Sequence, residues 1–287
     1  VTLIDQDLNK NSASDEDLVI KNTTRTHLIP SLQIGSPLML AANTTALAGV
    51  TINSVTDFSN IAYVDVALGN LAGGNLTLPT GWTGTQLAAT NNASQETSYF
   101  NYDVTAFLNS TNTMTSICLQ QGLAATNPES LACDNDSDGR NIVQVTGSAT
   151  TTTAMAYVAV DFSASKGLGS YSSIPVALDV FSYGPGINNA IYRILLEETD
   201  DNSATFVGSI EYEMLNQINI DKPATYTALS TVDQDVDIII EQDMTDEDSP
   251  RVNYLDLGAD GVSTQIADQV EAPTHSGVVS FDSDNYK

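Results

Sequence analysis

The clearest chemistry in this sequence comes from short acidic loops in which oxygen-bearing side chains alternate. Asp134, Asp136 and Asp138 occupy every second position, and Gly139 follows them. Carboxylates with this spacing in a tight turn converge on a hard cation such as Ca²⁺, and the glycine permits the bend. An EF-hand would place its bidentate glutamate at Val145, so the pattern fits a shorter calcium loop between strands.

Two further loops repeat this chemistry with less complete patterns. Their candidate oxygen ligands are Asp5, Asp7, Asn9, Glu16, Asp256 and Asp260. In the first of these loops Lys10 stands where the glycine would be, and we expect strands rather than helices to flank it. For all three loops the alternative is an exposed turn of acidic and amide side chains that binds no ion. Calcium is therefore the one cofactor that the sequence suggests.

Catalytic patterns are weak. His27 and His275 are far apart in the sequence, and His275 beside Ser276 is more typical of a loop histidine than of a hydrolase. Glu197 and Glu198 are adjacent, so on a strand they would point to opposite faces and could not act as an acid–base pair. The sequence has no phosphate-binding glycine loop, nucleophile elbow or zinc-spaced Cys/His cluster. We therefore expect that the protein is not an enzyme.

The two cysteines, Cys118 and Cys133, bracket a turn-rich stretch and are predicted to form a disulfide. Such a bond would stabilise the fold by about 3 kcal/mol in the chain-entropy description, and it would indicate an oxidising compartment. The alternative is two buried thiols in a cytosolic core. Possible glycosylation sites follow the Asn-X-Ser/Thr pattern and are Asn22, Asn43, Asn75, Asn92, Asn109 and Asn135. Ser and Thr are so abundant that chance explains about as many such sites.

The charge is strongly one-sided, with 36 acidic and 9 basic residues and a net charge of -27. This balance argues against binding nucleic acid, which requires a basic surface, and against docking on an anionic membrane. It favours either the attraction of small cations or solubility in salty water. No apolar stretch is long enough to span a bilayer as a helix, so we expect no transmembrane segment in this chain.

Alternating and β-branched residues predict many short strands, which is typical of an all-β sandwich. The predicted strands are 1–4, 18–21, 61–68, 141–146, 154–162, 174–183, 191–197, 205–213, 236–241, 251–255 and 277–281. The first two are expected to pair around the acidic loop, and 174–183 is expected to pair with 191–197. Residues 103–108 suggest a short helical turn, and 264–270 is a second helix candidate.

Composition divides the chain into three parts. Residues 1–20 and 176–287 are acidic, whereas 21–175 are rich in Thr, Ala and Gly. The shared character of the two ends predicts that they pack together as one β-sandwich. The middle is then a second β domain or a long β-rich insertion. The chain lacks an initiator Met and has a predicted strand close to its last residue, so we expect it to be one section of a longer protein.

The C-terminal part carries a recognisable series of motifs. They are NAIYR (189–193), LEET (196–199), FVGSIEY (206–212), TDEDSPRVNY (245–254), DGV (260–262), ADQ (267–269) and EAPTHSG (271–277). This series resembles the repeated segment of the large S-layer proteins of ammonia-oxidising archaea (Thaumarchaeota), and VTLIDQDLN (1–9) resembles the start of the next such segment. The resemblance covers about 110 residues and the first 20, but not the middle. It implies a secreted, often glycosylated chain of immunoglobulin-like domains.

The resemblance and the composition together favour a structural cell-surface protein that self-assembles into an extracellular lattice with an acidic, cation-attracting surface. Its partners would be copies of itself and small cations. One alternative is a filament or pilus subunit in which a terminal strand, such as 1–4, completes a neighbour's sheet. A second is an adhesin or carbohydrate-binding module, for which Trp82, expected in a loop, is the only tryptophan available. A packed anchor is the plainer interpretation of Trp82.

Overall fold

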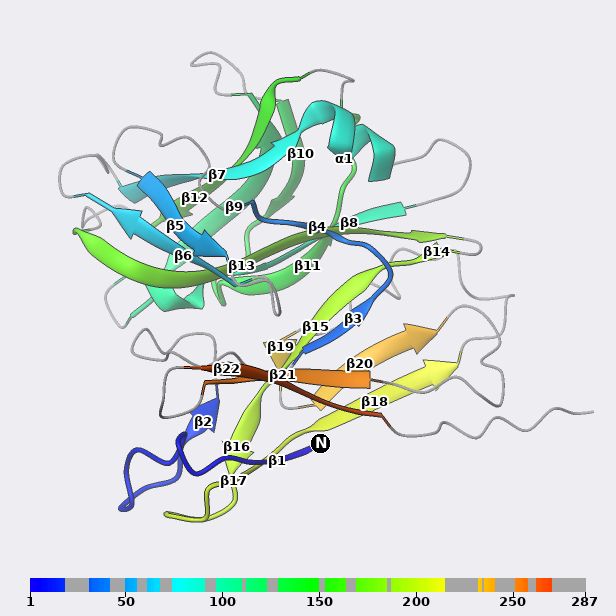
Figure 1. The fold of residues 1–287 in the computed structure, drawn as a ribbon. Coiled ribbons are helices and arrows are strands. Elements are labelled where there is room, and N and C mark those ends of the chain that lie inside the picture. The colour runs from blue at the N-terminus through cyan, green and yellow to red at the C-terminus, as the bar shows by residue number, and fades with distance from the viewer. Residues whose placement is uncertain are drawn as a thin grey trace, which may run out of the picture.

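Strands make up most of the chain, which confirms the predicted all-β class. The computed structural model describes residues 1–18, 31–41, 50–55, 61–67, 74–90, 97–109, 112–122, 129–149, 153–163, 169–184, 187–214, 232–233, 235–240, 251–257 and 262–269. Its sheets form two groups, one above the other in Figure 1. We call the strands within residues 38–188 the central sandwich, and those within 2–34 and 190–269 the terminal sheets.

The central sandwich has two antiparallel sheets. The first has the order β10-β9-β12-β7, with bounds Glu129–Asp134, Met114–Gln121, Met155–Phe162 and Asn75–Thr83. The second has the order β11-β8-β13-β6-β5, with bounds Arg140–Gln144, Thr97–Asp103, Tyr171–Gly184, Ile61–Val66 and Val50–Val55. β4 (Leu38–Met39) and β14 (Ile187–Asn188) also pair with β13.

One apolar core joins these two sheets. Val158 and Val160 of β12 and Val176, Leu178 and Val180 of β13 are all buried in it. These residues alternate along their strands, because successive side chains of a strand point to opposite faces of the sheet. Each such burial stabilises the fold by about 1.5–3 kcal/mol. The alternation that predicted strands thus also selects the face that makes the core.

Trp82 lies inside β7 rather than in the expected loop. Its side chain is 2% exposed, and its Nε1–H donates a hydrogen bond of 2.7 Å to the Met39 carbonyl. The loop prediction is wrong because the Pro- and Gly-containing segment belongs to β7, which pairs with β12 on both sides of an irregularity that contains Gly81 (φ 77°). A buried indole with its donor satisfied is a core anchor and presents no stacking platform to a sugar.

Two short helical segments accompany the strands. α1 (Gly84–Thr90) begins after Thr83, whose hydroxyl accepts the Gln86 N–H at 3.3 Å while Gln86 Oε1 accepts the Thr83 N–H at 2.8 Å. This reciprocal pair is a capping box, which the sequence analysis overlooked. The 3₁₀ helix η2 (Thr105–Phe107) lies within the helical turn predicted over 103–108.

The terminal sheets combine both ends of the described chain. One sheet has the order β1-β17-β16-β2, with bounds Thr2–Ile4, Thr205–Val207, Leu196–Glu198 and Asp17–Leu18. The other has the order β19-β15-β3-β21-β22, with bounds Val232–Asp233, Ala190–Ile194, Ser31–Ile34, Arg251–Leu257 and Ser263–Gln269. β18 (Ser209–Met214) and β20 (Asp235–Ile240) form a parallel pair.

A second apolar core holds the terminal sheets against the central sandwich. It contains Leu3, Leu196 and Phe206 from the terminal sheets together with Ile61 and Ala177 from β6 and β13. The outer face of the sandwich's second sheet is therefore covered rather than exposed. The expected boundary between residues 175 and 176 falls inside β13, a strand that serves both cores.

The first two strands do not pair with each other as expected. Leu3 of β1 lies opposite Phe206 of β17, and Leu18 of β2 lies opposite Leu196 of β16. The hairpin of β16 and β17 separates β1 from β2, because its apolar residues provide buried partners for both. The acidic loop 5–16 therefore crosses the end of a four-stranded sheet instead of closing a hairpin.

Three other predictions need correction. β13 pairs with β14, and β15 pairs with β3, so 174–183 and 191–197 are not a hairpin. The strand predicted over 205–213 is divided at Gly208 into β17 and β18. The helix predicted over 264–270 is the strand β22, which pairs along its whole length with β21. The helical spacing there is overridden by the ladder to β21, which pairs the backbone of β22 along one side. The strand predicted over 277–281 lies outside the described residues.

Candidate functional site

The loop after β10 holds its carboxylates in a chain of turns. Asp134 Oδ1 accepts the Asp136 N–H at 3.0 Å, and Asp136 Oδ1 accepts the Asp138 N–H at 3.1 Å. The other oxygen of Asp134 accepts both the Tyr102 hydroxyl and the Asn141 amide at 2.8 Å. The protein's own donors therefore satisfy both Asp134 oxygens. Gly139 has a φ of 78°, so it makes the left-handed bend that the sequence suggested.

Tyr102 is the buried partner of this loop. Burial raises the pKa of Tyr102, and the hydrogen bond to Asp134 and the negative charges of Asp134, Asp136 and Asp138 raise it further. The phenol therefore stays protonated and continues to donate to Asp134. This arrangement explains the acidic loop as a structural turn that is tied to the core of the sandwich.

The N-terminal loop has the same design at its first residue. Asp5 Oδ1 accepts the Asp7 N–H at 2.9 Å, and Asp5 Oδ2 accepts the Tyr254 hydroxyl at 2.7 Å. Asp5, Asp7 and Asn9 are half-buried, as is Glu16, whose Oε2 accepts the Lys10 N–H at 2.8 Å. All four oxygen ligands predicted in this loop are therefore partly shielded from solvent.

Two of the predicted loops meet in space. A hollow of about 290 Å³ is lined by Asp5 and Asp7 from the first loop and by Asp256 from the third. The remaining lining residues are Leu3, Ile4, Gln6, Tyr254 and Ile266. Asp260, the other candidate of the third loop, lies outside the described residues. In the described part of the chain, no three His, Cys, Asp or Glu side chains form a group that could hold a metal ion as they stand.

Glu198 is a buried carboxylate that sequence reasoning considered only as a failed catalytic pair. Its side chain is 3% exposed, and Oε1 accepts the Ala204 N–H at 2.7 Å and the Ser203 hydroxyl at 3.4 Å. Oε2 is buried and accepts a hydrogen bond from none of the residues that the structure describes. The alternation of Leu196 and Glu198 on β16 was the signal for its inward direction, because residues two apart on a strand share a face.

A second buried charged group lies where the two cores meet. Arg193 of β15 donates to Asp179 of β13 at 2.8 Å and 3.3 Å, and the Asn101 amide donates to the same carboxylate at 3.2 Å. Burial raises the pKa of Asp179, and Arg193 and Asn101 oppose that shift. Burial likewise raises the pKa of Asp103, which accepts hydrogen bonds from Thr105. Sequence analysis gave no sign of this group, because its members come from three separate strands.

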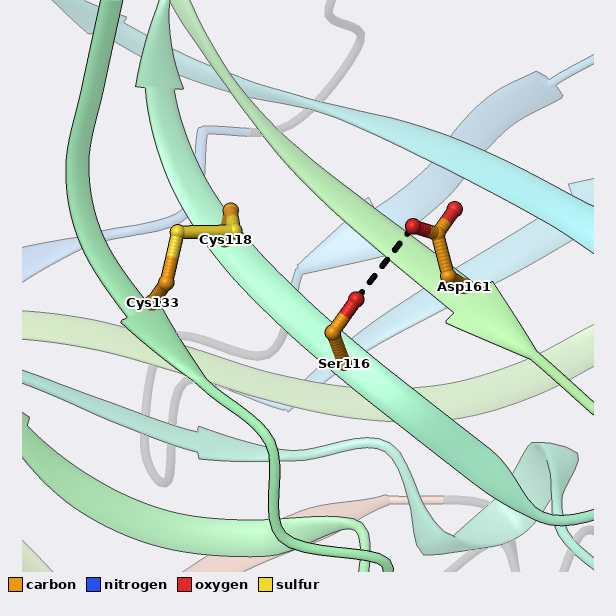
Figure 2. Close-up of a disulfide and its surroundings, with 4 residues drawn as sticks. All are labelled: Ser116, Cys118, Cys133 and Asp161. Atoms are coloured by element: carbon orange, nitrogen blue, oxygen red, sulfur yellow. Dashed lines mark hydrogen bonds between the residues drawn. A yellow bond between two sulfur atoms is a disulfide. The ribbon is translucent and has the colours of Figure 1, made fainter.

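Cys118 and Cys133 are joined by a disulfide between β9 and β10 (Figure 2). They lie directly opposite each other in the register of the two strands. On the neighbouring strand pair, the Ser116 hydroxyl donates to Asp161 of β12 at 3.2 Å. The disulfide therefore fastens the edge strand β10 to the sheet rather than closing a separate loop domain.

Three of the possible glycosylation sites are on the described surface. Asn75, Asn109 and Asn135 are exposed. Asn22, Asn43 and Asn92 lie outside the described residues, as do His27 and His275. Each of the three exposed asparagines is accessible to a glycan.

All four large hydrophobic side chains that are exposed in the described chain lie within, or directly next to, β1 or β22. They are Val1 (41% exposed), Ile4 (71%), Val262 (60%) and Ile266 (48%). Ile4 and Ile266 line the same acidic hollow. β1 and β22 each lie at the edge of their described sheet. We call Ile4 and Ile266, which meet at this hollow, the edge-strand patch.

No helix in the described part of the chain is long and apolar enough to cross a membrane. No protein-family model matches the chain, and no curated protein matches it. Function must therefore be argued from the chain's own surfaces.

Proposed function

We propose that this chain is a structural subunit of an extracellular S-layer, built of immunoglobulin-like sandwiches, that assembles with copies of itself. The edge-strand patch is the observation that carries the proposal. Isolated soluble proteins seldom gather their exposed large apolar side chains in one place, and such gathering marks an interaction site. An edge strand also offers unpaired backbone donors and acceptors to another chain.

Three further features support a surface coat. The disulfide suits an oxidising compartment, and the exposed asparagines at Asn75, Asn109 and Asn135 suit glycosylation. The net charge of -27 keeps such a coat hydrated and draws small cations toward it. The resemblance to the S-layer proteins of ammonia-oxidising archaea points in the same direction.

A filament assembled by strand addition is the second candidate, and the same edge strands favour it. Thr2–Ile4 already pairs with β17 of its own chain, and the Val1 amino group donates to the Gly208 carbonyl at 2.7 Å. This segment would therefore take part through its outer edge, or would first have to leave β17.

Negative-stain images of the native protein would distinguish these assemblies. Two-dimensional sheets support the coat, threads support the filament, and isolated particles at high concentration contradict both. The variant Ile4→Glu/Ile266→Glu is expected to abolish assembly. Ala89→Glu/Thr51→Glu is the matched control, because it adds the same charge at two exposed positions of the central sandwich. Equal assembly by the two variants would exclude the edge-strand patch as the interface.

A further inference from the structure

The Glu198 carboxylate is buried, so other groups in the fold must compensate the cost of removing it from water. Leu196 and Glu198 share the inward face of β16, and Leu196, Leu18 and Phe206 around them are almost fully buried. Taking a carboxylate out of water costs several kcal/mol unless both oxygens find partners. Donors reach Oε1, but Oε2 receives none from the described residues. A proton on Oε2 would turn it into a donor that itself requires an acceptor.

The acidic loop 5–16 closes over the same end of the sheet. The Asp5 N–H donates to the Ala204 carbonyl at 3.0 Å, while the Ala204 N–H donates to Glu198. The Glu198 N–H in turn donates to the Glu16 carbonyl at 2.8 Å. Asn9 reaches the same hairpin, because its amide donates to Asn202 Oδ1 at 2.8 Å. The backbone therefore fixes both ends of the loop beside the Glu198 carboxylate.

The register places the start of this loop and Glu198 on the same face of the sheet. Leu3 lies opposite Phe206, which lies opposite Glu198, so these three side chains share the inward face of the sheet. Asp5 follows Leu3 by two residues and continues the ladder through its bond to Ala204, which places it on that face. Asp5, Asp7, Asn9 and Glu16 are half-buried, Gln6 and Lys10 are exposed, and Leu8 between Asp7 and Asn9 is buried.

We propose that this end of the terminal sheet binds one Ca²⁺, with Glu198 Oε2 as its buried ligand and oxygens of loop 5–16 as the others. Calcium accepts six to eight oxygen ligands from carboxylates, amides, carbonyls and water in flexible geometry. The two aspartates, the asparagine and the glutamate of this loop supply that mixture of oxygens. The ion would connect β1 and β2, the two edges of the sheet, through the loop between them.

The loop at 134–138 is the natural control, because its local sequence is the better calcium pattern. Both oxygens of Asp134 already accept hydrogen bonds, as do both oxygens of Asp5, so the first aspartate does not distinguish the two loops. Among the described residues near the 134–138 loop, no buried carboxylate oxygen lacks a hydrogen-bond partner. The proposal therefore assigns calcium to the N-terminal loop and none to the loop with the better sequence match. It is independent of the proposed surface coat.

Calorimetric titration of the full chain with calcium chloride is the first test. One bound ion per chain is expected, with affinity at least tenfold weaker in Glu198→Gln and unchanged in Asp136→Asn. Glutamine retains the oxygen that accepts the Ala204 N–H, so the variant keeps the hairpin contact. If Glu198→Gln fails to fold, Asp5→Asn replaces it with the same expectation.

Hydrogen–deuterium exchange locates the ion independently of any variant. Adding calcium is expected to slow exchange in 5–16 and 198–204 and to leave 134–141 unchanged. Absence of binding, an unaltered affinity in Glu198→Gln, or protection confined to 134–141 would each overturn the assignment. Because these readouts do not involve assembly, failure here leaves the surface-coat proposal to its own test.

Discussion

Arg193 and Asp179 form an ion pair in which Nη1 and Oδ2 are 2.8 Å apart and both side chains are 0% exposed. Asp179 belongs to the central sandwich, and Arg193 belongs to the terminal sheets. The pair therefore crosses the boundary between the two cores. Apolar packing at this boundary tolerates small displacements of the two sheets. A bidentate guanidinium–carboxylate contact keeps both of its hydrogen bonds in one relative position of the sheets only.

Arg193→Met is expected to destabilise the fold by about 3–5 kcal/mol, because it leaves the Asp179 charge buried without its partner. The double variant Arg193→Met/Asp179→Leu removes both charges and is expected to lose much less stability. Urea unfolding of the wild type, the two single variants and the double variant gives the coupling energy. Strictly additive losses would mean that the pair does not act as a unit.

Tyr102→Phe tests the tie between the 134–138 loop and the core. At neutral pH the variant loses a hydrogen bond to a charged acceptor, which is worth about 1.5–3 kcal/mol. At high pH the wild type also loses folding stability through ionisation of Tyr102 in the unfolded chain. Burial and Asp134 raise the pKa of Tyr102 in the folded protein, whereas the unfolded chain releases this proton near pH 10. Wild-type stability should therefore fall as pH rises above about 10.

Because phenylalanine cannot ionise, the variant should lose less stability over the same pH interval. Urea midpoints measured from pH 7 to 11 provide the comparison. Between pH 7 and 9 the difference between the two proteins should stay constant, which serves as the internal control. Parallel curves up to pH 11 would show that the Tyr102 proton is not linked to folding.

Local alternation predicted strands well, but their partners depend on residues far away in the sequence. The inward face of β16 follows from the spacing of Leu196 and Glu198. Its position between β17 and β2 does not, because that pairing depends on which distant strands offer Leu18 and Phe206. Trp82 shows the same limit, since glycine and proline nearby indicated a loop, while pairing with the distant strand β12 places the segment in a sheet.

The candidate sites show this limit more strongly. Alternating carboxylates in 5–9 and 134–138 were visible in the sequence, and both loops form the predicted tight turns. The sequence could not reveal that Tyr254 and Tyr102 occupy the first aspartate of each loop, or that Glu198 lies beside only one of them. A site that depends on a buried group from another strand requires the register as well as the motif.

Reducing the Cys118–Cys133 bond is expected to destabilise the central sandwich. The cysteines are 15 residues apart, and closing a loop of about that length is worth about 3 kcal/mol in the chain-entropy description. The test is thermal unfolding of wild type and Cys118→Ala/Cys133→Ala, each with and without reductant. The reductant should lower the wild-type midpoint toward that of the variant and leave the variant unchanged. Two thiols alkylated in the unreduced native protein would contradict the bond itself.

Gly208 divides β17 from β18, and the space around it explains why no side chain is tolerated. A Cβ at this position would lie 2.5 Å from the Leu195 carbonyl oxygen and 2.7 Å from Leu196 Cδ2. Backbone would have to move, so Gly208→Ala is expected to cost about 1–3 kcal/mol, the range for overpacking a well-packed site. Gly169→Ala is the matched control, because nothing lies within 4 Å of its Cβ.

The same substitution should reach the N-terminal strand. The Gly208 N–H donates to the Val1 carbonyl at 3.1 Å, so displacement of Gly208 loosens the β1–β17 ladder as well as the bend. Hydrogen exchange of Leu3 and Ile4 is therefore expected to accelerate in Gly208→Ala and to remain at the wild-type rate in Gly169→Ala. Loss of global stability with unchanged exchange in β1 would place the strain elsewhere. Equal urea midpoints for the two alanine variants would refute the steric argument altogether.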